Sequence, residues 1–279
     1  MGIKKVKANT PGRRAATFDD FKDLSRVQPE KRLLVTKKKT GGRNATGKIT
    51  VRHRGGGTKR QLRIVDIKRD KFDIVATVAS IEYDPNRGAR LALVKYADGE
   101  KRYIIAPVSL KEGDKISSSK ESLDIKEGNA MPLKHIPAGV AVSCVELHKG
   151  QGAKIARGAG NLVYVMGIEG KYAQVKMPSG EIRLIDKDCM CTVGKVSNPD
   201  KRHITLGKAG RKRYLGFRPT VRGTAMNPVD HPHGGGEGKQ SIGMKHPKTM
   251  WGKPALGVKT RRKSSSDRLI IKRRSKRRK

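Results

Sequence analysis

The sequence predicts an all-β protein in which two small barrels are flanked by long basic, irregular extensions. Three observations lead to this prediction. Short runs are rich in Val, Ile and Tyr, turn residues separate them every ~8–12 positions, and positive charge is concentrated at the two ends. We find no segment with a convincing 3.6-residue apolar period, so no long amphipathic helix is expected.

Each predicted barrel has its own set of strands. The first set covers 61–67, 72–83, 90–97 and 101–106, with a strong hairpin turn at Asp98-Gly99 between the last two. The second set covers 140–147, 162–168, 172–177 and 181–186, with turns at Gly167, Gly170 and Pro178-Ser179-Gly180. Gly and Pro cluster in 126–139, where we expect the linker between the barrels.

The charge is unevenly distributed along the chain. The 279 residues carry 64 Lys+Arg against 25 Asp+Glu, a formal charge of +39. Residues 1–60 have a net charge of +14, residues 61–199 of +5, and residues 200–279 of +20. Such an excess repels itself unless a polyanion neutralises it, so nucleic acid is the leading partner and an anionic membrane surface a distant second.

The sequence also favours a cytoplasmic location. Its start has no apolar core of a secretory signal, and no apolar run approaches the ~18 residues needed to cross a bilayer. Cys144, Cys189 and Cys191 are odd in number and poorly spaced for a disulfide framework, which suits a reducing compartment. Cys189-Met190-Cys191 lacks the second pair that a zinc site requires, so we interpret these residues as small and buried.

The basic arms contain little that could form a core. Residues 36–60 and 198–263 consist largely of glycines, cations and polar residues. Alone, such segments cannot offset the entropy of ordering, so we expect them to order on a polyanion.

One stretch of the first arm comes within one residue of a phosphate-binding P-loop. Gly42 to Ile49 (GRNATGKI) has the glycine and lysine spacing, but Ile49 stands where a hydroxyl should meet magnesium. No apolar strand precedes it and no helix is expected after it. We therefore expect its glycines to bring backbone N–H groups close to RNA phosphates, with Lys48, Arg52, Arg54 and Lys59 neutralising charge.

The stretch NPVDHPHGGGEGK (227–239) is the chain's most unusual motif. His231 and His233 flank a proline, and with Asp230 or Glu237 they could hold a metal or form an acid–base pair. The alternative is an extended thread inserted into folded RNA, in which Gly234, Gly235 and Gly236 allow close approach. We favour the thread, because the segment lies in an arm without a scaffold to position catalytic groups.

The nucleic acid is predicted to be a large folded RNA. The sequence has no helix-turn-helix pattern, no zinc fingers and no basic region followed by heptads. It therefore gives little support for a protein that recognises duplex DNA. Four Phe and one Trp leave few platforms for base stacking. The remaining mode is recognition of the RNA by its shape and its phosphates, which suits a large folded RNA.

Several segments closely resemble the bacterial-type ribosomal protein L2 family of the large subunit. They are GTAMNPVDHPHGGGEGK (223–239) with RPTVRG (218–223) before it, HRGGGTKRQLRIVDIKR (53–69), IEYDPNRGARLALVKYADGEKRYIIAP (81–107) and the ending KRRSKRRK. The resemblance implies an OB-like barrel over 61–127, an SH3-like barrel over 128–197, and basic extensions over 1–60 and 198–279. In the one departure, the family has a single cysteine followed by a basic residue where this chain has Cys189-Met190-Cys191.

The resemblance also implies a function. It is that of a structural constituent of the large subunit that binds rRNA directly and supports subunit association, tRNA binding and the architecture around the peptidyl-transferase centre. In the family two barrel arginines are important for RNA binding, and they match Arg87 and Arg157. His231 matches a histidine discussed for peptide-bond formation; since RNA carries that chemistry, the implied role of Asp230, His231 and His233 is structural.

These arguments give a set of expected RNA-binding residues. The set is Lys48, Arg52, Arg54, Lys59, Arg87, Arg157, Arg213, Arg218, Arg222, Asn227, His231, His233 and Lys239. The expected partners are large-subunit (23S-type) rRNA, neighbouring ribosomal proteins and the small subunit, with no membrane. We expect no catalytic residue, metal or cofactor. The competing hypotheses are an enzyme that uses His231 with Asp230 and a general polyanion binder.

Overall fold

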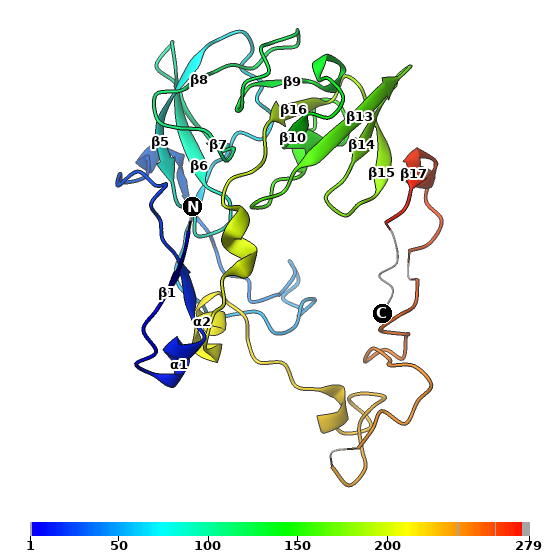
Figure 1. Cartoon of the computed structure of the whole chain (residues 1–279). Helices are drawn as coiled ribbons and strands as arrows, with labels where there is room; N and C mark the ends of the chain where they lie inside the picture. The colour runs from blue at the N-terminus through cyan, green and yellow to red at the C-terminus, as the bar shows by residue number, and fades with distance from the viewer. Residues whose placement is uncertain (1, 239, 260, 275–279) are drawn as a thin grey trace. The chain divides into compact units, whose positions relative to one another are not determined.

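The computed structural model describes residues 2–238, 240–259 and 261–274 and consists mainly of short β-strands (Figure 1). Its helices are short: α1 (Pro11–Arg14), α2 (Ala209–Tyr214) and single 3-10 turns at Lys31–Leu33, Leu133–His135, Pro199–His203, Gly223–Ala225 and Ser265–Leu269. Both larger sheets are curled, and the prediction of an all-β barrel protein is confirmed. Among the described residues, no helix has the length and apolar character that a membrane crossing would require.

The chain forms two compact units. Unit 1 comprises residues 1–38, 59–208 and 266–279, and unit 2 comprises residues 39–58 and 209–265. Part of the N-terminal arm thus belongs to the same unit as most of the C-terminal arm. The sequence alone did not suggest this association.

The first sheet of unit 1 has four antiparallel strands in the order β7-β6-β5-β8. They are β5 (Ala76–Glu82), β6 (Leu91–Tyr96), β7 (Lys101–Ile105) and β8 (Lys115–Ile116). Inward residues alternate along β5, and Val78, Val94 and Ile104 pack together in the core. The predicted Asp98-Gly99 turn closes the β6–β7 hairpin: Gly99 has φ +84° and its N–H donates to Tyr96 O at 2.9 Å.

The second sheet of unit 1 has seven strands in the order β17-β15-β14-β13-β10-β16-β9. They are β9 (Ala130–Pro132), β10 (Ala141–Ser143), β13 (Val163–Glu169), β14 (Tyr172–Lys176), β15 (Ile182–Asp186), β16 (Met190–Val193) and β17 (Ile270–Lys272). Val142, Val163 and Val175 are fully buried in its core. All eight predicted strands overlap observed strands, although their bounds differ.

Two interruptions explain the main differences in bounds. The predicted strand 140–147 breaks at Cys144, whose φ of +50° ends β10, and the next strand, β11 (Val145–Glu146), pairs instead with β12 (Ala153–Ile155). The predicted strand 72–83 begins only at Ala76, after Asp73 with φ +60°. Positive φ is incompatible with an extended strand, and nothing in the local residue types revealed it.

The stretch 126–139 is not a simple exposed linker. It contains β9 and the turn at Leu133–His135, and Met131 and Leu133 have no exposed surface. β9 pairs with β16, whose Cys191 lies opposite Met131. The glycines and prolines suggested a loop, but the apolar residues between them belong to the core of the second sheet.

The arms contribute regular structure to unit 1, contrary to the expectation that they are irregular throughout. In the N-terminal arm β1 (Ile3–Lys5) pairs with β2 (Thr17–Asp19), and β3 (Leu34–Thr36) pairs with β4 (Gln61–Arg63), which lies outside the arm in the expected strand 61–67. In the C-terminal arm β17 adds to the edge strand β15 (Figure 1). The strands within the arms were too short to be recognised, and pairing with a partner strand decides their conformation.

Candidate nucleic-acid interface

Unit 2 combines high positive charge with the absence of a core. Its two segments hold eighteen Lys and Arg residues against two acids, Asp230 and Glu237. None of its described residues is buried. A unit that removes so little apolar surface from water has little to offset the entropy of ordering.

Backbone contacts join the two segments of unit 2. The N–H groups of Gly55 and Thr58 donate to Gly216 O at 3.1 Å and to Tyr214 O at 3.0 Å. Arg218 N–H donates to His53 O at 3.0 Å. Glycine is required at position 57, because it has φ +81° and an added Cβ would lie 2.9 Å from the Gly216 backbone.

This pairing creates a basic hollow. The hollow measures about 1100 Å³, including space open to solvent, and no acidic residue lines it. Its cationic or ionisable lining residues are Lys39, Arg43, Arg52, His53, Arg54 and Arg218. The guanidinium carbon of Arg54 also lies 4.2 Å from the ring centroid of Phe217, which holds this side chain in place. A concave surface lined by one sign of charge focuses the field and attracts anions such as RNA phosphates.

The near P-loop lies beside the hollow but is built differently from a nucleotide-binding loop. Asn44 Oδ1 accepts hydrogen bonds from Thr46 N–H at 3.1 Å, Thr46 Oγ1 at 2.8 Å and Lys48 N–H at 3.0 Å. Two backbone donors that could cradle a phosphate are therefore already used within the loop. The loop has neither a preceding strand nor a following helix, and it presents Lys48 to solvent.

The histidine stretch is folded into consecutive turns rather than extended, which corrects the expected thread. His231 N–H donates to Asn227 O at 3.2 Å, Gly234 N–H to His231 O at 2.8 Å, and Gly235 N–H to Met226 O at 3.1 Å. The two histidine ring centroids are 4.7 Å apart, with the rings tilted at 57°. The turns place both rings on one side, as an extended chain would also have done.

The glycines of this stretch serve the protein's own fold. A Cβ on Gly234 would lie 2.6 Å from Met226 O and closer still to Asn227 O. Outside the glycine run, a Cβ on Gly223 would lie 2.5 Å from the His231 ring. We had expected Gly234 to 236 to permit approach to RNA, but at Gly234 the close neighbour is the chain itself.

The ring nitrogens of the two histidines take part in the same turns. His231 Nδ1 accepts from His233 N–H at 3.0 Å, and His233 Nε2 accepts from Lys248 N–H at 2.9 Å. A nitrogen that accepts a hydrogen bond offers its lone pair neither to a metal nor to a substrate proton. The arrangement therefore orients the rings and ties residues 231–233 to Lys248.

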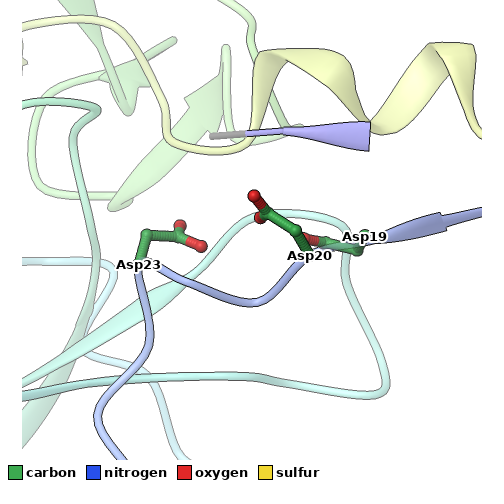
Figure 2. A group of neighbouring side chains, drawn as sticks. All are labelled: Asp19, Asp20 and Asp23. Carbon is green, nitrogen blue, oxygen red and sulfur yellow. The ribbon is translucent and has the colours of Figure 1, made fainter. Parts of the chain in front are cut away.

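A three-carboxylate group with metal-like spacing occurs elsewhere, at Asp19, Asp20 and Asp23 (Figure 2). Arg90, which is 1% exposed, donates to both oxygens of Asp19 at 2.8 Å and to Asp23 at 3.0 and 3.1 Å. Burial alone would raise the pKa of Asp19, but hydrogen bonds from Arg90 and Phe21 N–H hold it below its ordinary value. The buried guanidinium of Arg90 thus already pairs with two of the three carboxylates, and these ion pairs anchor the N-terminal arm to the first sheet.

Arg87 and Arg157 lie on neighbouring loops of unit 1. A Cβ on Gly88 would be 3.2 Å from Ala159 Cβ, so the loops touch. Burial raises the pKa of Cys144 to about 11, and the positive charges of Arg157 and Arg87 both oppose that rise, as expected if both are near this thiol. Arg87 Nε donates to the fully buried Asp84 at 2.7 Å, whereas Arg157 is exposed.

The other expected residues are mostly exposed. Arg52, Arg54 and Arg218 meet at the hollow, while Lys48, Arg213, Arg222 and Asn227 are exposed elsewhere in unit 2 and Lys59 is exposed in unit 1. Lys239 lies outside the described residues. Sequence reasoning missed Lys39, Arg43 and His53, although their position on the same glycine-rich arm could have indicated them.

The burial of the cysteines agrees with their interpretation as small packing residues. Cys189 and Cys191 are 0% and 1% exposed, and Cys144 is partly buried. Burial raises the pKa of Cys189 to about 12 and that of Cys191 further.

Family models match most of the chain. The model described as "Ribosomal Proteins L2, RNA binding N-terminal domain" matches residues 30–118. The model described as "Ribosomal Proteins L2, C-terminal domain" matches residues 126–252. The second match includes the histidine turns, and the first includes the basic hollow's N-terminal segment and the Arg87 loop. The chain, a structural and RNA-binding component of the large ribosomal subunit, belongs to the ribosomal protein L2 family.

Proposed function

We propose that unit 2 is an rRNA-binding module that completes its fold on the RNA, while the Arg87 and Arg157 loops form a second contact on unit 1. The observation that carries this proposal is the basic hollow, in a unit with eighteen basic residues, two acids and no buried described residue. RNA supplies the phosphates that the arginines pair with and the surface against which the arms pack.

The finer role follows from the family resemblance. We propose that the protein supports subunit association, tRNA binding and the architecture around the peptidyl-transferase centre, next to neighbouring ribosomal proteins and the small subunit in the cytoplasm. The proposed organisation is an N-terminal extension over 1–60, an OB-like barrel over 61–127, an SH3-like barrel over 128–197 and a C-terminal extension over 198–279. Asn227 and Lys239 complete the proposed RNA-binding residues of that last segment.

The proposed role is structural rather than catalytic. His231 Nδ1 and His233 Nε2 each accept a backbone N–H, which supports a positioning role for both rings. An enzyme would retain activity in the isolated protein and would lose it on His231→Ala without a matching loss of RNA binding. We expect instead that the substitution affects RNA binding and assembly together.

A nuclease-protection experiment tests the proposal. The full chain is mixed at moderately high salt with fragmented total RNA and excess duplex DNA, and the protected fragments are sequenced. We expect one discrete patch of large-subunit rRNA. A mixture of RNA and DNA without a preferred fragment would mean that charge alone governs binding, and the proposal would be wrong.

A charge-matched pair of variants tests the hollow itself. Substituting Arg52, Arg54 and Arg218 by Ala should lower the slope of log affinity against log salt by about 2–3, since each phosphate contact contributes ~0.7–0.9. The control replaces three exposed lysines of unit 1, Lys95, Lys115 and Lys171, by Ala. Equal losses in both variants would contradict a site at the hollow.

A further inference from the structure

Trp251 is the only tryptophan of the chain, and it is 75% exposed at the tip of a closed hairpin. Lys248 and Pro254 form a β-bridge, and Thr249 N–H donates to Lys253 O at 2.7 Å. Gly252 N–H donates to Thr249 O at 2.9 Å, so Met250 and Trp251 are the two central residues of a tight turn. The largest aromatic side chain of the protein is therefore presented outward on a hydrogen-bonded support.

The hairpin is attached to the histidine turns within unit 2. Lys248 N–H, at the base of the hairpin, donates to His233 Nε2 at 2.9 Å. A hydrogen bond from Gly235 N–H to Met226 O closes the turn that carries His233. The position of Trp251 is thus coupled to that of the histidine turns, which the C-terminal-domain family model covers.

The surroundings of Trp251 favour an anionic partner. Lys248 and Lys253 flank the turn and are exposed, and the sequence has no acidic residue between Gly238 and Ser266. An indole leaves a large apolar face in water unless a partner covers it. A partner that combines flat apolar faces with closely spaced negative charges fits both features, and an unpaired nucleotide of RNA has this chemistry.

We propose that Trp251 stacks on an unpaired base of the rRNA, with Lys248 and Lys253 contacting phosphates beside that base. The inference rests on the proposed function of unit 2 and adds a specific contact to it. Stacking of one base on an aromatic side chain contributes about 1–3 kcal/mol, and the surrounding lysines add charge neutralisation. An aromatic platform was not expected from a sequence so poor in aromatic residues.

Because the chain has one tryptophan, its fluorescence reports on this site in the unmodified protein. The full chain is titrated with large-subunit rRNA, with excitation at the red edge where tyrosine does not absorb. Retention of labelled rRNA on a filter measures binding in parallel. We expect the emission to be quenched as the RNA is bound, with the same midpoint as retention.

Three variants separate the contribution of the aromatic ring to RNA affinity from that of apolar surface area alone. Trp251→Phe keeps an aromatic face and should retain most of the affinity, whereas Trp251→Leu should lose about 5- to 100-fold. The control is Val229→Ala, which removes apolar surface from a residue of unit 2 that is 91% exposed, and should bind as the unsubstituted protein does. Since Trp251 is on the surface of a unit without buried described residues, its substitution removes no core packing.

The outcomes distinguish this inference from the proposed function. Retained rRNA with unchanged emission, or equal affinities of the Phe and Leu variants, would overturn the stacking contact and leave the proposed function standing. Loss of all specific retention by the unsubstituted chain would overturn both. A change in emission with phosphatidylserine vesicles but not with rRNA would assign Trp251 to a membrane surface instead.

Discussion

Arg90 and Asp19 are joined by two hydrogen bonds of 2.8 Å from one guanidinium nitrogen, although they lie 71 positions apart in the chain. Arg90 directly precedes β6, and Asp19 ends β2 of the N-terminal arm. The pair therefore fixes the arm to the first sheet. Arg90 contacts Asp23 as well, so two of the three nearby carboxylates already have a cationic partner.

We predict that Asp19→Asn destabilises unit 1 at neutral pH by about 1–3 kcal/mol, because it weakens a charged hydrogen-bonded pair with a buried guanidinium. The folded pKa of Asp19 is below that of the unfolded chain. The stabilisation is therefore present above pH ~4 and is lost as the pH falls through the folded pKa. Urea unfolding followed by circular dichroism across this pH range measures the effect.

Asp20→Asn is the matched control for this prediction. Asp20 belongs to the same group of carboxylates but accepts a backbone hydrogen bond at 3.4 Å from Lys22 rather than bonds from Arg90. Its substitution should change the free energy of unfolding and its acid dependence much less. Equal effects of the two substitutions would show that general charge, not the Arg90 pair, stabilises this region.

Arg87 and Arg157 should differ in a way that the sequence does not reveal. Replacing either by Ala should weaken binding to specific rRNA by about 1–3 kcal/mol. Only Arg87→Ala should also lower the melting temperature of the free protein, because it leaves the fully buried Asp84 without its ion-pair partner. Filter binding and thermal unfolding of both variants test this. Unchanged rRNA affinity in either would remove that arginine from the interface.

Glycine substitutions test whether the histidine turns matter for RNA binding. Gly223→Ala would force its Cβ to within 2.5 Å of the His231 ring, so we expect rRNA affinity to fall about tenfold or more. Gly210→Ala is the control, since a Cβ there meets nothing within 4 Å and alanine favours its helix α2. Filter binding of both variants, with histidine NMR signals as a measure of ring position, decides the question. Equal affinities would contradict the prediction.

The thiols should react slowly in the folded protein. Burial raises the pKa of Cys144 from 9.0 to about 11 and that of Cys189 to about 12, which lowers the thiolate fraction about 100-fold and 1000-fold at neutral pH. Labelling with iodoacetamide should therefore be fast for all three cysteines in denaturant and slow without it. Rapid modification of Cys189 in the native protein would contradict its place in the core of the second sheet.

The strands were predictable where local sequence and tertiary packing agree. The Asp98-Gly99 hairpin and the runs around β13, β14 and β15 have both β-forming residues and turn signals, and these strands form. The turn expected at Gly167 does not, because Gly167 lies inside β13 at a register shift. Prediction failed at β9 and β17, whose composition is that of loops and tails. Their pairing with β16 and β15 determines their conformation, and a pairing partner distant in the chain leaves no local pattern.

The candidate site divides in the same way. Charge counting identified the arms and three residues at the hollow, Arg52, Arg54 and Arg218, because electrostatic attraction to RNA depends on how many cations are present. It could not show that 39–58 and 209–265 pair with each other, nor that Gly223 and Gly234 make room for neighbouring side-chain and backbone atoms.

By itself, the sequence determined the all-β class, the charge distribution and the preference for a polyanion, because these follow from composition and local periodicity. Only the tertiary structure decided that a buried Arg90 pairs with Asp19 and Asp23, that the histidine rings accept backbone hydrogen bonds, and that Trp251 stands exposed on a closed turn. Each of these depends on the distance and direction between groups far apart in the chain or across a turn, and such geometry is set by packing and hydrogen bonding rather than by residue type.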